Sequence, residues 1–317
     1  MKEKITYDGL SAEAGQKSQG YIRVLDTDYH MPVTIINGVR KGPTVLITSG
    51  VHGGEYPCIE TAIQLAAELE PQEISGQLVI IHPVNVQAFR NRVSYVLPED
   101  GKNINRVFPG KKDGSLAEKI AYVISGEFQA RADYCFDLHG GDLHEELPPY
   151  VYYAGAGPEA VQQKSRELAG FLRAAYLVKS EAAGASVSAA FVHRVPSLLI
   201  ERGGRGLWSK EEVEDYKADI KNLLRYVGLL AGKARLPEQK AIELSGASTP
   251  LSSEEGCWHP AVKLGEQVEK GQKLGEVRNL FGAKVEEIFA PIGGVVIYMA
   301  VSLAINKGDP LLSLGFE

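Results

Sequence analysis

Hydrophobic residues recur along the chain in two patterns, short continuous apolar runs and longer stretches with helical spacing. Met31 to Gly50 predicts two strands separated by a Gly/Pro turn, and Gln77 to Ile81 predicts a buried strand. Between them Pro57 suits the first position of a helix, since proline has no N–H to leave unpaired, and helical spacing continues until Pro71. Three more helices (Ser115 to about Ala130, Glu159 to Ala174, Lys210 to Leu230) alternate with three more strands (Tyr134 to Leu138, Tyr150 to Tyr153, Ser197 to Ile200). This alternation predicts an α/β fold with a mostly parallel sheet flanked by helices.

The pattern changes after about Ala234, where short apolar runs are punctuated by glycine. Lys270-Gly271-Gln272-Lys273-Leu274 is echoed by Lys307-Gly308-Asp309-Pro310-Leu311, which indicates two similar hairpin halves. The segment resembles the lipoyl/biotinyl barrel-sandwich hybrid, a small all-β domain. We therefore expect two domains, a catalytic domain over residues 1–236 and a C-terminal β domain over residues 237–317.

Composition narrows the class of protein. The 317 residues contain 34 Lys and Arg against 40 Asp and Glu, so a net charge of -6 argues against nucleic acid as a partner. No apolar run approaches the about 20 residues of a membrane helix, and the N-terminal segment lacks the apolar stretch of a signal peptide. The three cysteines are far apart, which excludes a disulfide framework and a thiolate zinc site and fits a reducing cytoplasm. We expect a cytoplasmic protein with neither a nucleic-acid nor a membrane partner.

Two histidines and a glutamate lie where strands are predicted to end. His52 and Glu55 follow a buried strand within a glycine-rich turn, and His139 follows another strand before Gly140-Gly141. The His-x-x-Glu spacing alone favours a role outside metal binding, but His139 supplies a third ligand of the kind that catalytic zinc uses, leaving a fourth position open for water. Asp137, two residues before His139, either orients that imidazole or caps a turn.

Two further segments carry candidate chemistry. Glu201 closes an apolar strand before Gly203-Gly204, a position that suits a general base, although without further context the residue alone favours a solvated glutamate or a partner of Arg202. Asn105 and Arg106 precede Phe108-Pro109-Gly110, which suits a rigid loop that binds an anionic group. Arg90 and Arg92 offer one more positive group nearby, the other being a surface charge.

Taken in order, His52-x-x-Glu55, Asn105-Arg106, Asp137-x-His139 and Glu201-x-Gly203 resemble the succinylglutamate desuccinylase/aspartoacylase family, which is related to the zinc carboxypeptidases. The resemblance implies one zinc ion held by His52, Glu55 and His139, and Glu201 as the acid/base. It also implies that Asn105 and Arg106 bind a substrate carboxylate. A further arginine of the family polarises the scissile carbonyl, and of Arg90 and Arg92 we favour Arg92.

Three functions follow from these features. The first is a zinc-dependent amidohydrolase that removes an acyl group from a small N-acylated amino acid or a related amine. The alternative is a zinc carboxypeptidase acting on peptide C-termini, which the extra β domain disfavours because in the family that domain narrows the entrance. A carrier role would need a modified lysine at a hairpin tip, and Lys284 lacks the flanking residues that modifying enzymes read. We expect the amidohydrolase; the sequence leaves a homo-oligomer open.

Overall fold

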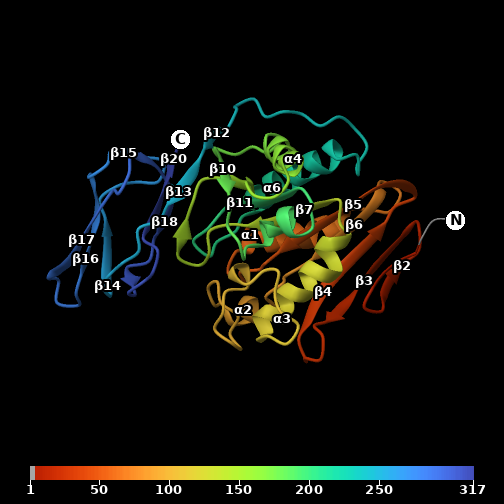
Figure 1. The fold of residues 1–317 in the computed structure, drawn as a ribbon, viewed down its shortest axis with the longest axis horizontal. Coiled ribbons are helices and arrows are strands. Elements are labelled where there is room, and N and C mark those ends of the chain that lie inside the picture. Colours follow the sequence, from red (N-terminus) through yellow and green to blue (C-terminus); the bar gives the residue numbers. More distant parts are fainter. Residues whose placement is uncertain (1–3) are drawn as a thin grey trace.

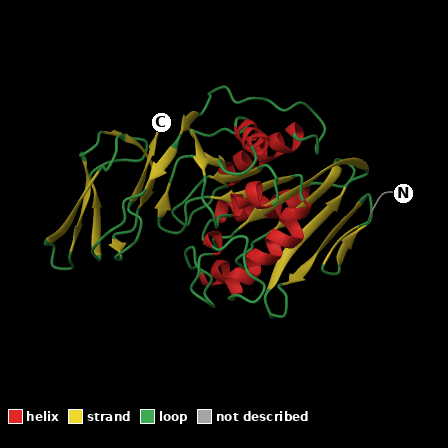
Figure 2. Cartoon of the chain, in the orientation of Figure 1, coloured by secondary structure: helices red, strands yellow, loops and turns green. Residues whose placement is uncertain are grey.

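The computed structural model describes residues 4–317, which form a large α/β part and a smaller β part side by side (Figure 1). The α/β part is built on one nine-stranded sheet, and its strands and helices are distinguished in Figure 2. In spatial order its strands are β12 (Ile242–Leu244), β10 (Tyr176–Ser180), β9 (Tyr150–Ala154), β11 (Ser197–Glu201), β7 (Tyr134–His139), β5 (Arg40–Ser49), β6 (Ser75–Ile81), β4 (His30–Asn37) and β3 (Gln16–Arg23). Five of the pairings are parallel and three, β9–β11, β4–β6 and β3–β4, are antiparallel. The predicted mostly parallel sheet is confirmed.

Helices cover both faces of this sheet. Within β5, Val45 and Ile47 pack into a core shared with α1 and α6, whereas Leu46 packs into a second core shared with α3. Alternate residues of a strand point to opposite faces, so the continuous apolar run of β5 is explained by burial on both sides. The helices are α1 (Tyr56–Glu68), α2 (Val86–Asn91), α3 (Leu116–Val123), α4 (Glu159–Ala169), α5 (Ala189–Val192) and α6 (Lys210–Tyr226). The remaining elements of this part are the hairpin β1 (Ile5–Tyr7) and β2 (Leu10–Ala12) and four short helical turns, η1 (Ile104–Arg106), η2 (Ile124–Phe128), η3 (Gln129–Arg131) and η4 (Ser186–Ser188).

The predicted helices exist, but two end earlier than the sequence suggested. α4 ends at Ala169 before Gly170, and α6 ends at Tyr226, shortly before Gly228 takes a φ of +78°. Gly228 takes the left-handed conformation that commonly ends a helix, and this signal outweighs the apolar spacing that continues beyond α6. Gly170 ends α4 with φ of -64°, in the right-handed region. The helix predicted from Ser115 has its capping box and stays helical to Arg131, with η2 and η3 continuing α3.

The C-terminal part consists of two antiparallel sheets that enclose one hydrophobic core, which includes Trp258, Leu274 and Leu314. The first sheet contains β13 (Gly246–Ser248), β20 (Leu312–Phe316), β18 (Gly294–Ala300) and β15 (Gln267–Val268), and the second contains β17 (Lys284–Phe289), β16 (Lys273–Arg278), β14 (Gly256–Pro260) and β19 (Ala304–Ile305). Gly271 and Gly308 occupy matching turns with φ of +84° and +90°, as the sequence repeat predicts. The small all-β unit is therefore confirmed.

Two strands connect the parts. β12 lies after residue 236, where we predicted the domain boundary, yet it pairs with β10 of the nine-stranded sheet before β13 joins β20. β8 (Glu145–Glu146), from the loop after β7, pairs with β18 of the C-terminal part. The C-terminal part therefore lies directly against the loop after β7. Among residues 4–317, no helix is long and apolar enough to cross a lipid bilayer.

Candidate metal centre and active site

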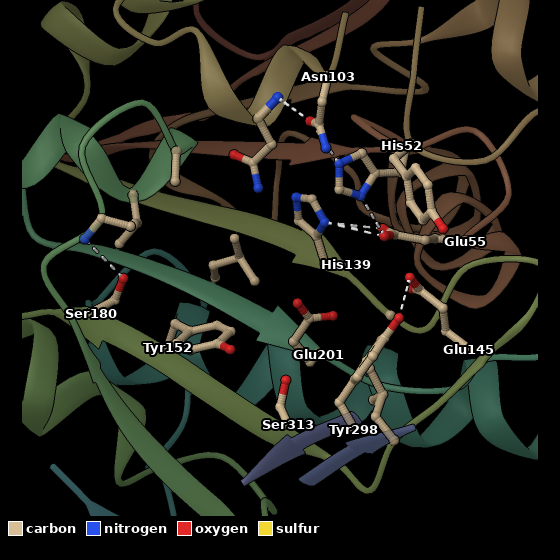
Figure 3. A pocket seen from close by; sticks show the side chains of 18 of the residues that line it. His52, Glu55, Asn103, His139, Glu145, Tyr152, Ser180, Glu201, Tyr298 and Ser313 are labelled. Carbon is tan, nitrogen blue, oxygen red and sulfur yellow. Dashed lines mark hydrogen bonds and ion pairs between the residues drawn. The ribbon is translucent and has the colours of Figure 1, made fainter. Parts of the chain in front are cut away.

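The carboxyl ends of three neighbouring parallel strands meet at one edge of the nine-stranded sheet. β7 lies between β5 and β11, and its last residue, His139, is the register partner of Glu201, the last residue of β11. β5 ends at Ser49, and the turn that follows carries His52 and Glu55. The candidate residues, far apart in the sequence, are thus brought to one place (Figure 3).

Two glycines allow the turn after β5 to pack tightly against its surroundings. A Cβ on Gly53 would lie 2.1 Å from the backbone nitrogen of Phe89, and one on Gly54 would lie 1.9 Å from Asp142 Oδ1. Neither position can accept a side chain without displacing its neighbour. The turn ends at Glu55, the residue immediately before α1, so the helix start fixes the backbone from which this side chain extends.

His52, Glu55 and His139 form a compact group that could hold a metal ion. Glu55 Oε1 lies 2.7 Å from His52 Nδ1, and Glu55 Oε2 lies 3.1 Å from His139 Nδ1. The three residues are buried, and their ligand atoms all lie within 4.8 Å of one another. Burial lowers the pKa of His139, but the carboxylates of Asp137 and Glu55 outweigh burial and raise that pKa well above its usual range. The site thus favours positive charge, and its donor set fits a divalent ion with an open coordination position.

The outer nitrogens of both imidazoles have hydrogen-bond partners. His139 Nε2 lies 2.7 Å from Asp137 Oδ2, and His52 Nε2 lies 3.1 Å from Asn103 Oδ1. With Nδ1 facing the metal position, each Nε2–H donates to an oxygen, which fixes the tautomer and the ring orientation. Asp137 therefore occupies the place that its predicted orienting role requires.

The loop that carries Asn105 and Arg106 is tied to the metal group through Asn103. Asn103 Oδ1 accepts the backbone N–H of Asn105 at 2.8 Å, and Asn105 Oδ1 accepts the N–H of Ser186 at 2.7 Å. Arg106 is exposed, lines the cavity next to the metal group, and donates from Nη1 to the carbonyl of Asn105 at 2.8 Å. The loop thus holds a guanidinium at the cavity wall.

Glu201 faces the cavity beside His139. Its Oε2 is buried and accepts no hydrogen bond within the described residues, and burial raises the pKa of this carboxyl well above its usual range. The neighbouring Arg202 instead pairs with Asp219, at 2.6 Å, so the alternative of a Glu201–Arg202 pair is not what the structure contains. An ionisable group with a raised pKa and a free oxygen suits proton transfer.

These groups surround a cavity of about 540 Å³, a size that fits a small molecule. Tyr150 and Tyr152 of β9 form part of its wall, and Glu145 lies beside the metal group. The C-terminal part completes the wall with Thr249, Tyr298, Pro310 and Ser313.

A family model supplies the decisive comparison, because the succinylglutamate desuccinylase/aspartoacylase catalytic domain matches residues 41–227. The chain belongs to this family. The N-alpha-acetyl-L-2,4-diaminobutyric acid deacetylase of Halomonas elongata is 29% identical over 291 residues, which cover 89% of this chain and 84% of that protein. The product-bound structure of the ectoine utilization protein EutE (DoeB) from Ruegeria pomeroyi superposes with a TM-score of 0.84 at 27% identity, covering 95% of each chain. A succinylglutamate desuccinylase/aspartoacylase from Rhodobacter sphaeroides, at 24% identity, has the same fold with a TM-score of 0.81 over 95% of this chain and 96% of its own.

Arg90 and Arg92, the two candidates for a carbonyl-polarising arginine, do not line the cavity. Arg92 ends α2 in a left-handed conformation with φ of +54°, and its side chain is exposed. Arg90, on the last turn of α2, is exposed as well, and neither arginine lines the cavity. The role of Arg92 stays a prediction.

Among the residues of this desuccinylase/aspartoacylase-type site that the sequence did not reveal are Asn103, Glu145 and Tyr298. Asn103 could have been recognised, because an asparagine side chain in a turn commonly accepts the backbone N–H two residues later, here that of Asn105. Glu145 and Tyr298 carried none, since their hydrogen bond joins positions 153 residues apart.

Proposed function

We propose that this chain is a zinc-dependent amidohydrolase that removes an acyl group from a small N-acylated amino acid. The observation that carries the proposal is the placement of Glu201 beside the His52–Glu55–His139 group in a cavity whose wall also presents Arg106. The family is one of deacylases, and its relative from Halomonas elongata is named for the removal of an acetyl group from an amino acid.

The chemistry follows from the residues. Zinc bound by His52, Glu55 and His139 would act as a Lewis acid that lowers the pKa of water and polarises the amide carbonyl. The free Oε2 of Glu201 accepts a proton from the attacking water, and Glu201 later delivers this proton to the leaving nitrogen. A carboxyl group with a raised pKa suits both roles. Arg106 binds the substrate carboxylate in two-point fashion, and its hydrogen bond to the Asn105 carbonyl positions the guanidinium.

The alternative, a carboxypeptidase, is less well supported by the cavity. A peptide substrate needs an open groove for the residues before its C-terminus. Tyr298, Ser313 and their neighbours from the C-terminal part instead form one wall of the cavity. This wall favours a small substrate. Placement in the cytoplasm and a possible homo-oligomer rest on the sequence alone and stay predictions.

A substrate screen tests the proposal. Zinc-loaded protein should hydrolyse at least one member of a panel of N-acetyl and N-succinyl amino acids, with amine release as the readout. His52→Ala, which removes one ligand, should lower zinc content in elemental analysis and abolish turnover. Activity confined to C-terminal peptide bonds, or full zinc content in His52→Ala, would contradict the proposal.

A further inference from the structure

Carboxylates outnumber cationic side chains around the cavity, and one of these carboxylates, that of Glu145, has no cationic partner among the described residues. Among the described residues, the cavity wall contains three carboxylates, Glu55, Glu145 and Glu201, and one guanidinium, that of Arg106. Under the proposed function, Glu55 belongs to the metal, Glu201 handles the proton and Arg106 binds the substrate carboxylate. Glu145 is left over, and within residues 4–317 no lysine, arginine or histidine forms an ion pair with it.

The contacts of Glu145 hold it firmly at the cavity. It is 9% exposed, its Oε1 accepts the hydroxyl of Tyr298 at 2.9 Å, and its Oε2 accepts the N–H of Asp142 at 2.9 Å. Pairing between β8 and β18 places Glu145 opposite Ala300, which brings Tyr298 within reach. Figure 3 shows this pair beside the metal group. A carboxylate can accept about four hydrogen bonds, so each oxygen can take another donor.

A buried carboxylate without a cation is unfavourable. Burial raises the pKa of Glu145 to about 7, because the ionised carboxylate is poorly solvated at this position. A positive group entering the cavity would remove this penalty and gain a short, charge-assisted hydrogen bond. Tyr298 and the N–H of Asp142 already orient the carboxylate, so little ordering is needed when such a group binds.

We infer that Glu145, held in place by Tyr298, binds a positively charged amine on the substrate's side chain. The inference rests on the proposed function and narrows its substrate class. The α-nitrogen of an N-acyl amino acid is an uncharged amide, so the positive charge has to come from the side chain. For the same reason Glu145 disfavours substrates with an acidic side chain, such as N-acyl aspartate or glutamate, by like-charge repulsion.

The test compares matched substrates on matched variants. N-α-acetyl-2,4-diaminobutyrate and N-α-acetylnorvaline differ only in a terminal ammonium against a methyl group. The zinc-loaded wild type should prefer the cationic compound in kcat/KM, and Glu145→Gln should lower kcat/KM for it by about ten-fold or more, equivalent to about 1.4 kcal/mol, while changing the neutral compound little. Tyr298→Phe, which keeps the carboxylate but removes the hydroxyl that positions it, should cause a smaller loss, again selective for the cationic compound.

Glu146→Gln is the control, because Glu146 is the next residue, lies outside the cavity lining and interacts with Arg205 at 3.7 Å. It should leave both substrates unaffected. Equal turnover of both compounds by the wild type, or an equal loss on both in Glu145→Gln, would overturn the inference while leaving the deacylase proposal intact. If neither compound nor any other N-acyl amino acid is hydrolysed, the proposed function fails. Calorimetric binding of the same two compounds then decides the inference, which requires tighter binding of the cationic one and loss of that preference in Glu145→Gln.

Discussion

Replacing Asp137 by asparagine should weaken metal binding without removing a metal ligand. Three donors converge on this buried carboxylate. Oδ1 accepts the hydroxyl of Thr48 at 2.5 Å, and Oδ2 accepts His139 Nε2–H at 2.7 Å together with the hydroxyl of Ser186. An asparagine offers one acceptor oxygen and turns an NH₂ group toward the others, so at least one donor loses its partner. If the amide oxygen faces His139, the imidazole keeps its hydrogen bond but loses the negative charge behind it; if the NH₂ group faces His139, the hydrogen bond is lost as well.

The expected loss of zinc affinity can be estimated because Asp137 contacts the outer nitrogen of a metal-binding imidazole, that of His139. Loss of a carboxylate behind a ligand imidazole typically costs about 10- to 100-fold in metal affinity, or about 1.4 to 2.7 kcal/mol. Competition against a chromogenic chelator measures the zinc Kd of each variant directly. Thr48→Val, which removes one donor and leaves the His139 contact intact, should have a smaller effect.

The control for Asp137→Asn is Asp133→Asn. Asp133 lies just before β7, accepts the N–H of Thr44 at 2.7 Å and forms no hydrogen bond with a metal-binding residue within the described part of the chain. The Asp133→Asn protein should therefore bind zinc with the Kd of the wild type. Circular dichroism establishes that both variants fold. A folded Asp137→Asn protein with a zinc Kd within two-fold of the wild type would refute the orienting role.

Two further predictions concern charged groups of the cavity. Arg106→Lys should raise KM because a single ammonium cannot replace the two-point contact, and this loss should largely vanish for a substrate whose carboxylate is amidated; an equal loss on both would indicate a structural role. Glu145 should lower the stability of the metal-free protein as pH rises, since its folded pKa of about 7 lies above the ordinary value of 4.5 and folding therefore favours the protonated form. The free energy of unfolding of Glu145→Gln should therefore exceed that of the wild type by an amount that grows between pH 4.5 and 7, up to about 3 kcal/mol. Urea unfolding of both proteins at pH 5 and pH 8 measures this difference, and a difference that does not grow with pH would contradict the prediction.

Most of the fold and the centre of the site could be predicted because they depend on local pattern. Continuous apolar runs that end in glycine marked the ends of β5, β7 and β11, and parallel strands bring such ends to the same edge of a sheet. His52, His139 and Glu201 were therefore identifiable from the sequence alone. Helix ends were less predictable, because α6 stops shortly before the left-handed Gly228 although its apolar spacing continues.

The cavity wall could not be predicted, because it depends on contacts between distant segments. Tyr298 reaches Glu145 only because β18 pairs with β8, and no periodicity within either segment encodes that pairing. The role of Arg92 came from the family resemblance and stays a prediction; its side chain lies exposed at the end of α2.

The most direct test of the account is the turnover of Glu201→Gln at full zinc content. Glutamine keeps the shape of the side chain and can still hydrogen-bond water, but it cannot accept a proton. General acid–base catalysis typically contributes about 10²- to 10⁴-fold, so kcat on the best N-acyl amino acid should fall by at least about 10²-fold with a modest change in KM. Metal content and melting temperature should match or exceed those of the wild type, since the substitution removes a buried carboxyl whose Oε2 has no hydrogen-bond partner among the described residues. Near-normal turnover in a folded, zinc-replete Glu201→Gln protein would contradict the mechanism.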